Sequence, residues 1–313
     1  MSQPHVHDQQ DLHTPSDLLR AYQLRFDQMA QTPYLNYPKV VHLETLVSCP
    51  AACSFCPYPV LTRKGTRMDD ALIDKIIHEL AAIPVQVPFQ LFPFKVNEPF
   101  MEPRLFELMG KINRMLPNAQ LSLVTSAAPL TEAKALQLNQ VVNLQYLWLS
   151  VHESDPEAYT RLMQLPWERT AQRLQMLHRL KQEGQIFYPV VLARVGDGSA
   201  ADQDFLDWGQ HHYPLFKTGV YQRGDWLRQV SGEQVAGVSP DAPDISCLRW
   251  FELSITATGQ VAQCCMDGQA EWPLGDVSQQ HVLEVYNQAA YRRRRELALS
   301  RRGISPCGSC SFM

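Results

Sequence analysis

Residues 49–56 read Cys-Pro-Ala-Ala-Cys-Ser-Phe-Cys, with thiols at Cys49, Cys53 and Cys56. They directly follow an apolar, β-branched stretch at 40–47 that predicts a strand. Three thiolates this close together can bind one face of a cubane iron–sulfur cluster and leave one iron without a protein ligand. A structural zinc site would need a fourth ligand, and no cysteine follows before Cys247. The spacing therefore favours an iron–sulfur cluster over zinc at this place.

The composition narrows the class of protein further. The chain has 313 residues, a net charge of −4 and eight cysteines in two groups. This charge provides no basic surface for nucleic acid, and no apolar run approaches the roughly 20 residues that span a bilayer. The N-terminus lacks the apolar stretch of a secretory signal. We therefore expect a cytoplasmic protein with no nucleic-acid or membrane partner, whose thiols serve metals or catalysis rather than disulfides.

Outward from residues 49–56, short apolar segments alternate with helical patterns. Apolar spacings of three and four residues predict helices at 69–82, 105–115 and 167–181. The predicted strands are 40–47, 85–94, 121–125, 144–150, 186–194 and 216–221. Strands that alternate with helices form a parallel sheet, and this length fits about six βα units. We predict an α/β fold, a partial (β/α)6 TIM-like barrel, with residues 49–56 at the carboxyl ends of the strands, where active centres lie.

Three domains are expected along the chain. Residues 1–37 form an N-terminal tail and short helix, residues 38–225 the barrel, and residues 226–313 a small C-terminal domain. A loop-like segment rich in Gly and Pro at 223–245 marks the boundary. The C-terminal domain is predicted to contain a hairpin (251–256 and 261–264) and a helix near 283–299.

The second group of cysteines lies in this C-terminal region. Gly259 at the predicted hairpin turn would bring Cys247 and Cys264 to the same point, and Cys307 and Cys310 form a terminal C-x-x-C pair. Four thiolates of this kind hold either zinc or a fully ligated [4Fe–4S] cluster. The spacing alone leaves both open.

The first motif resembles a known family. The pattern C-x-x-x-C-x-x-C after the first strand, with Phe55 before the third cysteine, is similar to the radical S-adenosylmethionine (radical SAM) superfamily, and the match extends over nearly the whole chain. In that superfamily the methionine moiety of S-adenosylmethionine chelates the open iron. An electron from the cluster then cleaves the cofactor to a 5′-deoxyadenosyl radical, which abstracts hydrogen from a substrate. The resemblance also implies a flavodoxin- or ferredoxin-type reductant.

The same resemblance implies cofactor contacts. Val96-Asn97-Glu98-Pro99 resembles the family's G-G-E-P segment, so Glu98 is expected to hold the methionine ammonium. Phe55 is expected beside the cofactor. Ser150 matches a serine commonly near it, and Arg194 is expected to pair with the methionine carboxylate. His152 and Glu153, just past Ser150, are expected in a solvated loop.

The C-terminal cysteines resemble the "twitch" form of the SPASM extension, which carries one auxiliary [4Fe–4S] cluster. A full SPASM domain needs about seven cysteines here, whereas this region has five. The resemblance assigns Cys247, Cys264, Cys307 and Cys310 as ligands and leaves zinc as the alternative. Cys265 is then a spare thiol that could donate hydrogen to a substrate radical, and Asp267 a candidate substrate base.

The resulting hypothesis is a radical SAM oxidoreductase or epimerase that acts on a small, sugar- or aminocyclitol-like metabolite. The short segment before the first strand favours such a substrate over a peptide, and a peptide-modifying maturase is the alternative. A non-catalytic zinc-binding adaptor is the alternative of another class. The basic run at 292–295 is interpreted as a solvated helical face.

Overall fold

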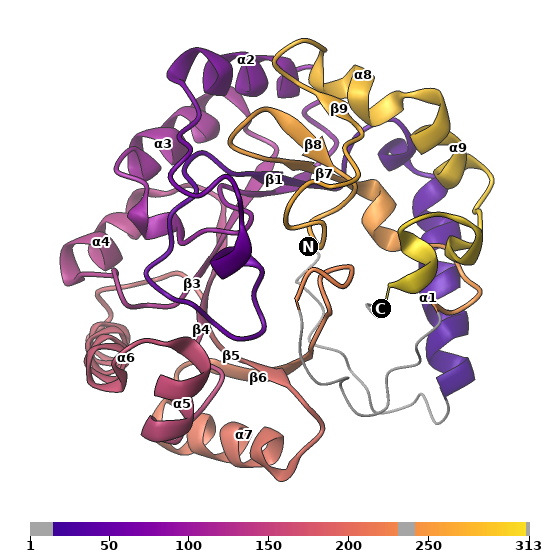
Figure 1. Ribbon diagram of the computed structural model, residues 1–313. Helices are drawn as coiled ribbons and strands as arrows, with labels where there is room; N and C mark the ends of the chain where they lie inside the picture. Colours follow the sequence, from indigo (N-terminus) through magenta and orange to yellow (C-terminus); the bar gives the residue numbers. More distant parts are fainter. Residues whose placement is uncertain (1–14, 231–241, 311–313) are drawn as a thin grey trace.

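The computed structural model describes residues 15–230 and 242–310 of the chain. Its strands form one bent sheet with helices on the outside, an α/β architecture (Figure 1). The described strands follow the order β6-β5-β4-β3-β2-β1-β7-β8-β9. Their bounds are β1 Val40–Leu43, β2 Phe89–Phe92, β3 Ala119–Thr125, β4 Leu144–Ser150, β5 Val190–Gly196, β6 Lys217–Gln222, β7 Glu252–Ile255, β8 Gln260–Ala262 and β9 Gly275–Asp276. The predicted tail at 1–14 and the loop at 231–241 lie outside the described residues.

Helices follow the strands of the barrel and also flank it at both ends of the chain. Their bounds are α1 Pro15–Ala30, α2 Asp70–Leu80, α3 Leu105–Met115, α4 Glu132–Gln137, α5 Pro156–Met163, α6 Trp167–Gln182, α7 Ala200–His212, α8 Val282–Asn287 and α9 Ala289–Glu296. None of the described helices is both long and apolar enough to span a bilayer.

Strands β1 to β6 pair in parallel with their sequence neighbours, which confirms the predicted partial barrel. The second strand is shorter than predicted. Pro84 and Pro88 break the segment before it, and Pro93 follows its last residue. Helices α4, α5 and α7 were not predicted from periodicity. For α5 a local signal exists: Asp155 caps the helix by accepting a hydrogen bond from Ala158, and Pro156 occupies the first turn.

The C-terminal hairpin continues the same sheet instead of forming a sheet of its own. Strand β7 pairs in parallel with β1, with Val40 opposite Glu252 and Leu43 opposite Ile255. Strand β8 then returns antiparallel to β7. Gly259 in the connecting turn has φ +89°, the left-handed conformation that favours glycine, as predicted. The helix expected at 283–299 is two helices, since Gln288 between them takes an extended ψ of 142°.

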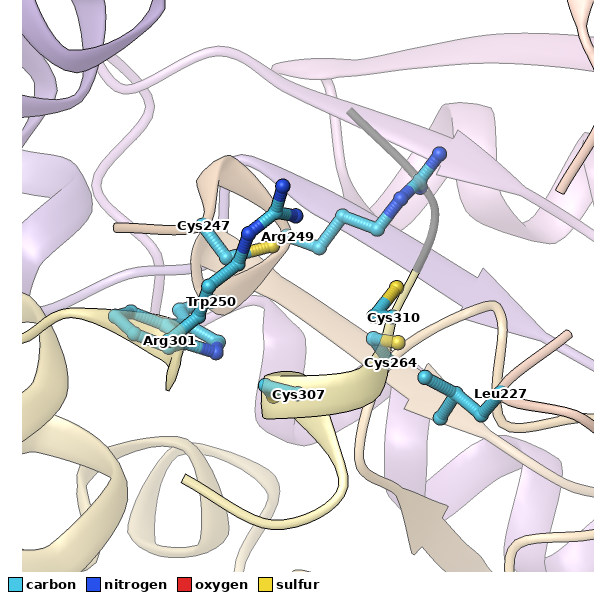
Figure 2. Close-up of a pocket in the computed structure, with 8 residues that line it drawn as sticks. All are labelled: Leu227, Cys247, Arg249, Trp250, Cys264, Arg301, Cys307 and Cys310. Atoms are coloured by element: carbon cyan, nitrogen blue, oxygen red, sulfur yellow. The ribbon is translucent and has the colours of Figure 1, made fainter. Parts of the chain in front are cut away.

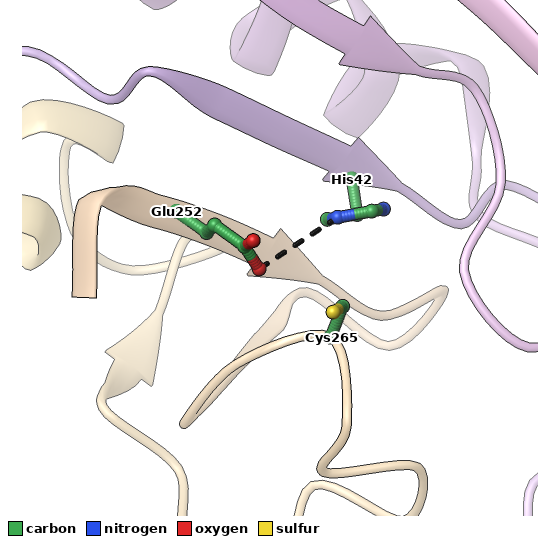
Figure 3. Close-up of side chains that lie close together, drawn as sticks. All are labelled: His42, Glu252 and Cys265. Carbon is green, nitrogen blue, oxygen red and sulfur yellow. Dashed lines mark ion pairs between the residues drawn. The ribbon is translucent and has the colours of Figure 1, made fainter. Parts of the chain in front are cut away.

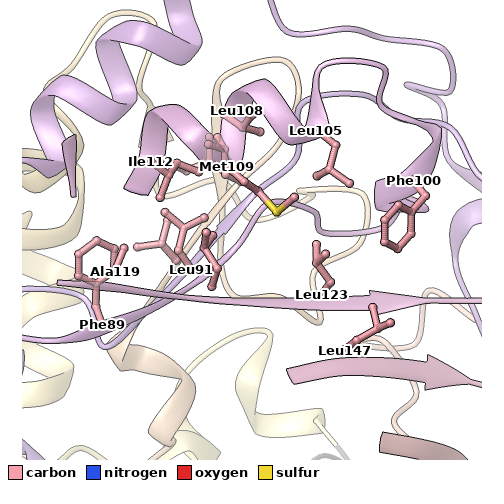
Figure 4. Packing of buried hydrophobic residues seen from close by; sticks show 14 of the residues in the cluster. Phe89, Leu91, Phe100, Leu105, Leu108, Met109, Ile112, Ala119, Leu123 and Leu147 are labelled. Atoms are coloured by element: carbon pink, nitrogen blue, oxygen red, sulfur yellow. The ribbon is translucent and has the colours of Figure 1, made fainter. Parts of the chain in front are cut away.

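Alternation along the strands separates two faces of the sheet. The outward positions pack against the helices, as Leu91 and Leu123 do near Met109 of α3 (Figure 4). The inward positions form a second cluster of mostly aromatic side chains with partly exposed neighbours, comprising Phe92, Phe94, Tyr146, Val191, Val40, Val124 and Trp148. The outer face therefore supplies the core, and the inner face is left for other contacts.

Candidate active site and iron–sulfur sites

The three-cysteine loop begins where β1 ends and is fixed at several points along its backbone. The Val47 N–H donates to Thr66 O at 2.9 Å, and the Glu98 N–H donates to Ser48 O at 2.9 Å. The far side of the loop meets the end of α5, where the Ser54 N–H donates to Leu162 O at 3.1 Å. The loop is therefore held over the carboxyl ends of β1 and β2.

All three thiols of this loop are partly buried. Burial raises the pKa of Cys49 to about 12 and that of Cys56 to about 11, and it raises the pKa of Cys53 further still. The charges of Cys56 and Glu98 add to the effect at Cys49 and Cys53. A metal cluster supplies the positive charge that stabilises such thiolates, so the residues present fit an iron–sulfur cluster.

Glu98 joins the ends of β2 and β3. Its carboxylate is 3% exposed and accepts hydrogen bonds from Thr125 Oγ1 at 2.6 Å, from Ser126 N and Oγ at 2.8 Å, and from the Phe100 N–H at 3.2 Å. Burial raises its pKa, while these hydrogen bonds act in the opposite direction. Residues after three successive strands therefore converge at one place.

Phe55 contacts the end of β4. Its ring packs edge-on against His152, with ring centroids 4.7 Å apart. His152 is 3% exposed, and its Nδ1 accepts a hydrogen bond from the Val195 N–H at 2.9 Å. Burial, and secondarily Arg194, lowers the pKa of His152 to about 3, so the imidazole is neutral. The expectation of a solvated loop at His152 is wrong, because this ring fills the space between Phe55 and β5.

Arg194 points outward from the sheet, toward α7. Its guanidinium is 2% exposed and binds Glu153 at 2.5 Å, Asp202 at 2.7 Å and Asp197 at 3.2 Å. Arg194 and Leu192 are two residues apart on β5, so their side chains lie on the same face of the sheet, and Leu192 packs in the core beneath the helices. This placement differs from the expected pairing with a methionine carboxylate, since three protein carboxylates already bind the group. Ser150 ends β4 as expected, and its contact with a cofactor stays a prediction.

The four C-terminal cysteines assigned as ligands meet in one pocket. Figure 2 shows Cys264 beside Cys310, with Cys247 and Cys307 on the other walls. Two cations, Arg249 and Arg301, line the same pocket together with Leu227 and Trp250. A cluster or zinc ion held by four thiolates carries a net negative charge, which the two guanidinium groups offset. The pocket therefore fits a tetrathiolate metal site.

Cys265 follows the end of β8 and does not line this pocket. Its Sγ accepts a hydrogen bond from Arg249 Nη1 at 2.6 Å and lies close to His42 and Glu252. Sequence reasoning missed these three partners. The signal that could have found them is a polar residue at an inward position of a strand, as in His42 of β1 and Glu252 of β7.

Asp267 is completely buried and anchors the loop after β8. Its carboxylate accepts hydrogen bonds from Gln229 Nε2 at 3.0 Å and from three backbone N–H groups at 3.0 to 3.3 Å, those of Gln263, Glu271 and Trp272. This differs from the expected role as a substrate base, because four donors occupy both oxygens and no exposed edge remains.

Comparison with known protein families assigns the C-terminal region. A model of the SPASM family, described as an iron–sulfur cluster-binding domain, matches residues 247–311. This region is a SPASM domain. The match includes all four cysteines of the pocket, so iron–sulfur rather than zinc is the metal of this domain type. No curated protein matches the chain in sequence.

Solved structures show the same fold over most of the chain. BtrN in complex with AdoMet and 2-DOIA is 15% identical, with a TM-score of 0.59 over 88% of this chain and 93% of BtrN. Native anSMEcpe with bound AdoMet is 13% identical, with a TM-score of 0.58 over 84% of this chain and 82% of that one. SuiB of Streptococcus suis, bound to precursor peptide SuiA, is 12% identical, with a TM-score of 0.60 over 99% and 77%. The chain thus shares its fold with these three structures, and its residues 247–311 match the SPASM family.

Proposed function

We propose that the protein binds a [4Fe–4S] cluster through Cys49, Cys53 and Cys56, cleaves S-adenosylmethionine reductively and abstracts hydrogen from a small polar metabolite. The SPASM domain holds a second [4Fe–4S] cluster through Cys247, Cys264, Cys307 and Cys310. A flavodoxin- or ferredoxin-type protein supplies the electron. The reaction class is oxidation or epimerisation.

The observation that carries this proposal is the three-thiol loop at the carboxyl ends of β1 and β2. Within the described part of the chain, this loop supplies three sulfur ligands. Three ligands leave one iron of a cubane free to bind a small molecule. The cofactor supplies the radical chemistry when it is bound. The chain supplies the ligands, the buried surroundings and the position of the substrate.

Glu98 is the residue best suited to an ammonium group. Its carboxylate is buried next to the cysteine loop, and burial raises its pKa. A cation placed there offsets the cost of burying a negative charge. The hydroxyl groups of Thr125 and Ser126 can rotate to share the carboxylate with such a ligand, which makes these two side chains part of the proposed cofactor site.

Cys265 supports the epimerase branch of the proposal. Its thiol lies outside the tetrathiolate pocket, on the side of the inward residues His42 and Glu252. Burial raises the pKa of Cys265 to about 12, so the sulfur carries its hydrogen at neutral pH. A protonated thiol facing the barrel interior can give a hydrogen atom to a substrate carbon radical. The thiyl radical left on Cys265 then takes one electron, from the flavodoxin- or ferredoxin-type reductant, and one proton to restore the thiol.

The first test is the iron and acid-labile sulfide content after anaerobic reconstitution. Wild type should bind about eight irons per chain, and Cys49/Cys53/Cys56→Ala should bind about four. Reductive cleavage of S-adenosylmethionine should be abolished in the triple variant. Cys265→Ala is the matched control and should keep about eight irons.

Other results would contradict the proposal at defined points. Four irons together with one zinc would leave the radical site intact and refute the auxiliary cluster. Zinc in both sites without iron would refute the enzyme and favour a zinc-binding adaptor. A peptide substrate, the second candidate, would be indicated if cleavage is coupled to modification of a peptide and of no small metabolite.

A further inference from the structure

His42 and Glu252 form a polar patch on the inner face of the sheet, where β1 and β7 pair. His42 lies opposite Ser254 in the parallel register. Glu252 is two residues before Ser254 on β7, so it lies on the same face of the sheet. Figure 3 shows the His42 ring, the Glu252 carboxylate and the Cys265 thiol pointing toward one another. Their ligand atoms all lie within 4.8 Å of one another.

Only one of the two carboxylate oxygens of Glu252 accepts a hydrogen bond from the described residues. Oε1 accepts a hydrogen bond from Arg249 Nη1 at 3.0 Å. Oε2 is buried, receives no hydrogen bond within residues 15–230 and 242–310, and faces His42 Nε2 at 3.8 Å, which is too long for a hydrogen bond. The residue as a whole is 9% exposed. A buried carboxylate oxygen without a donor is costly, and a ligand that donates a hydrogen bond removes this cost.

The charges around this oxygen determine which donor fits. Arg249 Nη1 contacts both the Glu252 carboxylate and Cys265 Sγ, the latter at 2.6 Å. Lys95 Nζ lies 3.5 Å from Cys265 O. Arg249 already pairs with the Glu252 carboxylate, and the charges of Arg249 and Lys95 both act on the neighbouring His42. A divalent metal ion or an ammonium group placed here would therefore meet two positive charges. A neutral donor, such as a hydroxyl group, meets no such repulsion.

The surface beside the patch is aromatic. The His42 ring stacks on Phe92, with centroids 4.9 Å apart and an angle of 11° between the planes. Phe92 packs edge-on against Phe94 at 5.6 Å, and Trp148 lies against Tyr221 at 4.0 Å across the inner face. His42 and Trp148 are partly exposed. Such a surface suits the apolar C–H face of a ring.

We propose that Glu252 Oε2, flanked by His42 and Cys265, accepts a hydrogen bond from a hydroxyl group of a neutral, hydroxyl-bearing ring substrate that packs on the aromatic inner face. The proposal rests on the proposed function, since it names the substrate class of the same barrel. Glu252 and His42 are substrate-contact residues in this arrangement. Arg249, which also lines the cysteine pocket, holds the carboxylate in position.

Binding can be tested without turnover, on the anaerobically iron-loaded full chain. Calorimetric titrations would use three sets of six-membered ring probes: myo-inositol and cis-1,2-cyclohexanediol, cyclohexylamine, and cyclohexanecarboxylate. The hydroxylated rings should bind with the lowest Kd, and Glu252→Gln should raise that Kd about tenfold. Glu168→Gln, at an exposed position of α6, is the matched control and should leave the Kd unchanged.

His42→Phe is a second variant, because it keeps the ring that stacks on Phe92 and removes the nitrogen. It should weaken binding of the hydroxylated rings while the iron content stays at the wild-type value. Tighter binding of the amine or the carboxylate, no binding of either hydroxylated ring, or stoichiometric Zn²⁺ binding that Glu252→Gln removes would each overturn the proposal. Cleavage of S-adenosylmethionine by wild type is measured separately, so failure of the radical chemistry is distinguished from failure of this site.

Discussion

Glu44, Glu98 and Glu252 are buried glutamates on the inner face and at the strand ends of this barrel. They differ in how many hydrogen bonds each accepts. Glu44 accepts four hydrogen bonds and Glu98 also accepts four, all from protein groups. Glu252 accepts one hydrogen bond from residues within 15–230 and 242–310, namely from Arg249. A carboxylate can accept about four hydrogen bonds, so protein groups alone saturate Glu44 and Glu98. Glu98 can bind a ligand only where a hydroxyl of Thr125 or Ser126 rotates to share the carboxylate. Glu252 keeps capacity for a ligand.

His152 gives the residue-scale prediction. Its pKa is lowered to about 3 in the folded protein, below the unfolded value near 6.5, so the unfolded state binds the proton more readily. The stabilising contribution of the neutral ring is therefore complete above pH 6.5 and is lost as the pH falls toward 3. Between pH 7.5 and 5.5 wild type should lose about 1 kcal/mol of unfolding free energy that His152→Asn does not lose.

Asn is chosen because its Oδ1 can replace Nδ1 as the acceptor for the Val195 N–H. The measurement is chemical denaturation of both proteins over this pH range. An equal loss in wild type and variant would contradict the assignment of His152 as a buried neutral ring.

At the scale of elements, the Arg295 side chain bridges the break between α8 and α9. This residue was expected on a solvated face, yet it is completely buried, which corrects the interpretation of the basic run. Its guanidinium lies 3.8 Å from the Tyr286 ring centroid and 4.9 Å from that of Tyr291. It donates to Tyr286 O at 2.8 Å and to Trp250 O at 3.2 Å. One side chain thus joins the end of α8 to the segment that follows Cys247.

Arg295→Met should lower the unfolding free energy by about 2–4 kcal/mol, because it removes a buried donor to two carbonyl groups and the stacked cation. Arg293→Met is the matched control on the same helix, since Arg293 is exposed, and should change the stability by less than about 0.5 kcal/mol. Thermal unfolding of the iron-loaded proteins measures both. Equal effects of the two substitutions would refute the structural role of Arg295.

At the scale of the whole molecule, Glu44 connects the three-cysteine loop to the SPASM region. Its carboxylate is completely buried and accepts hydrogen bonds from Arg63 Nε at 2.8 Å, from the Val96 N–H at 3.2 Å and from the Ala257 N–H at 3.2 Å. Arg63 also donates to Gly268 O at 2.6 Å. The loop after the three cysteines, the segment before Glu98 and the SPASM hairpin therefore meet at a single side chain.

Glu44→Ala should lower the unfolding free energy by about 3–5 kcal/mol, because it leaves the buried Arg63 without its carboxylate. The same substitution should reduce iron retention at both cluster sites, since both loops lose a fixed point. Glu132→Ala removes one of two exposed carboxylates that pair with Arg179 and should lower the unfolding free energy by at most about 1 kcal/mol. Loss of iron from only one of the two sites would contradict the view that Glu44 joins them.

The sequence by itself determined the features that depend on neighbouring residues. Three features are local in this sense: the spacing of Cys49, Cys53 and Cys56, the alternation of the first six strands with helices, and the glycine at Gly259. They predict ligands, a parallel barrel and a turn. Only the tertiary structure decided the rest. His42, Glu252 and Cys265 meet because β7 pairs with β1 across about two thirds of the chain, and periodicity does not specify which strands pair. Arg194 turns away from the interior for a related reason: its side of the strand follows from register and from the carboxylates of neighbouring elements, neither of which its position in the sequence reveals.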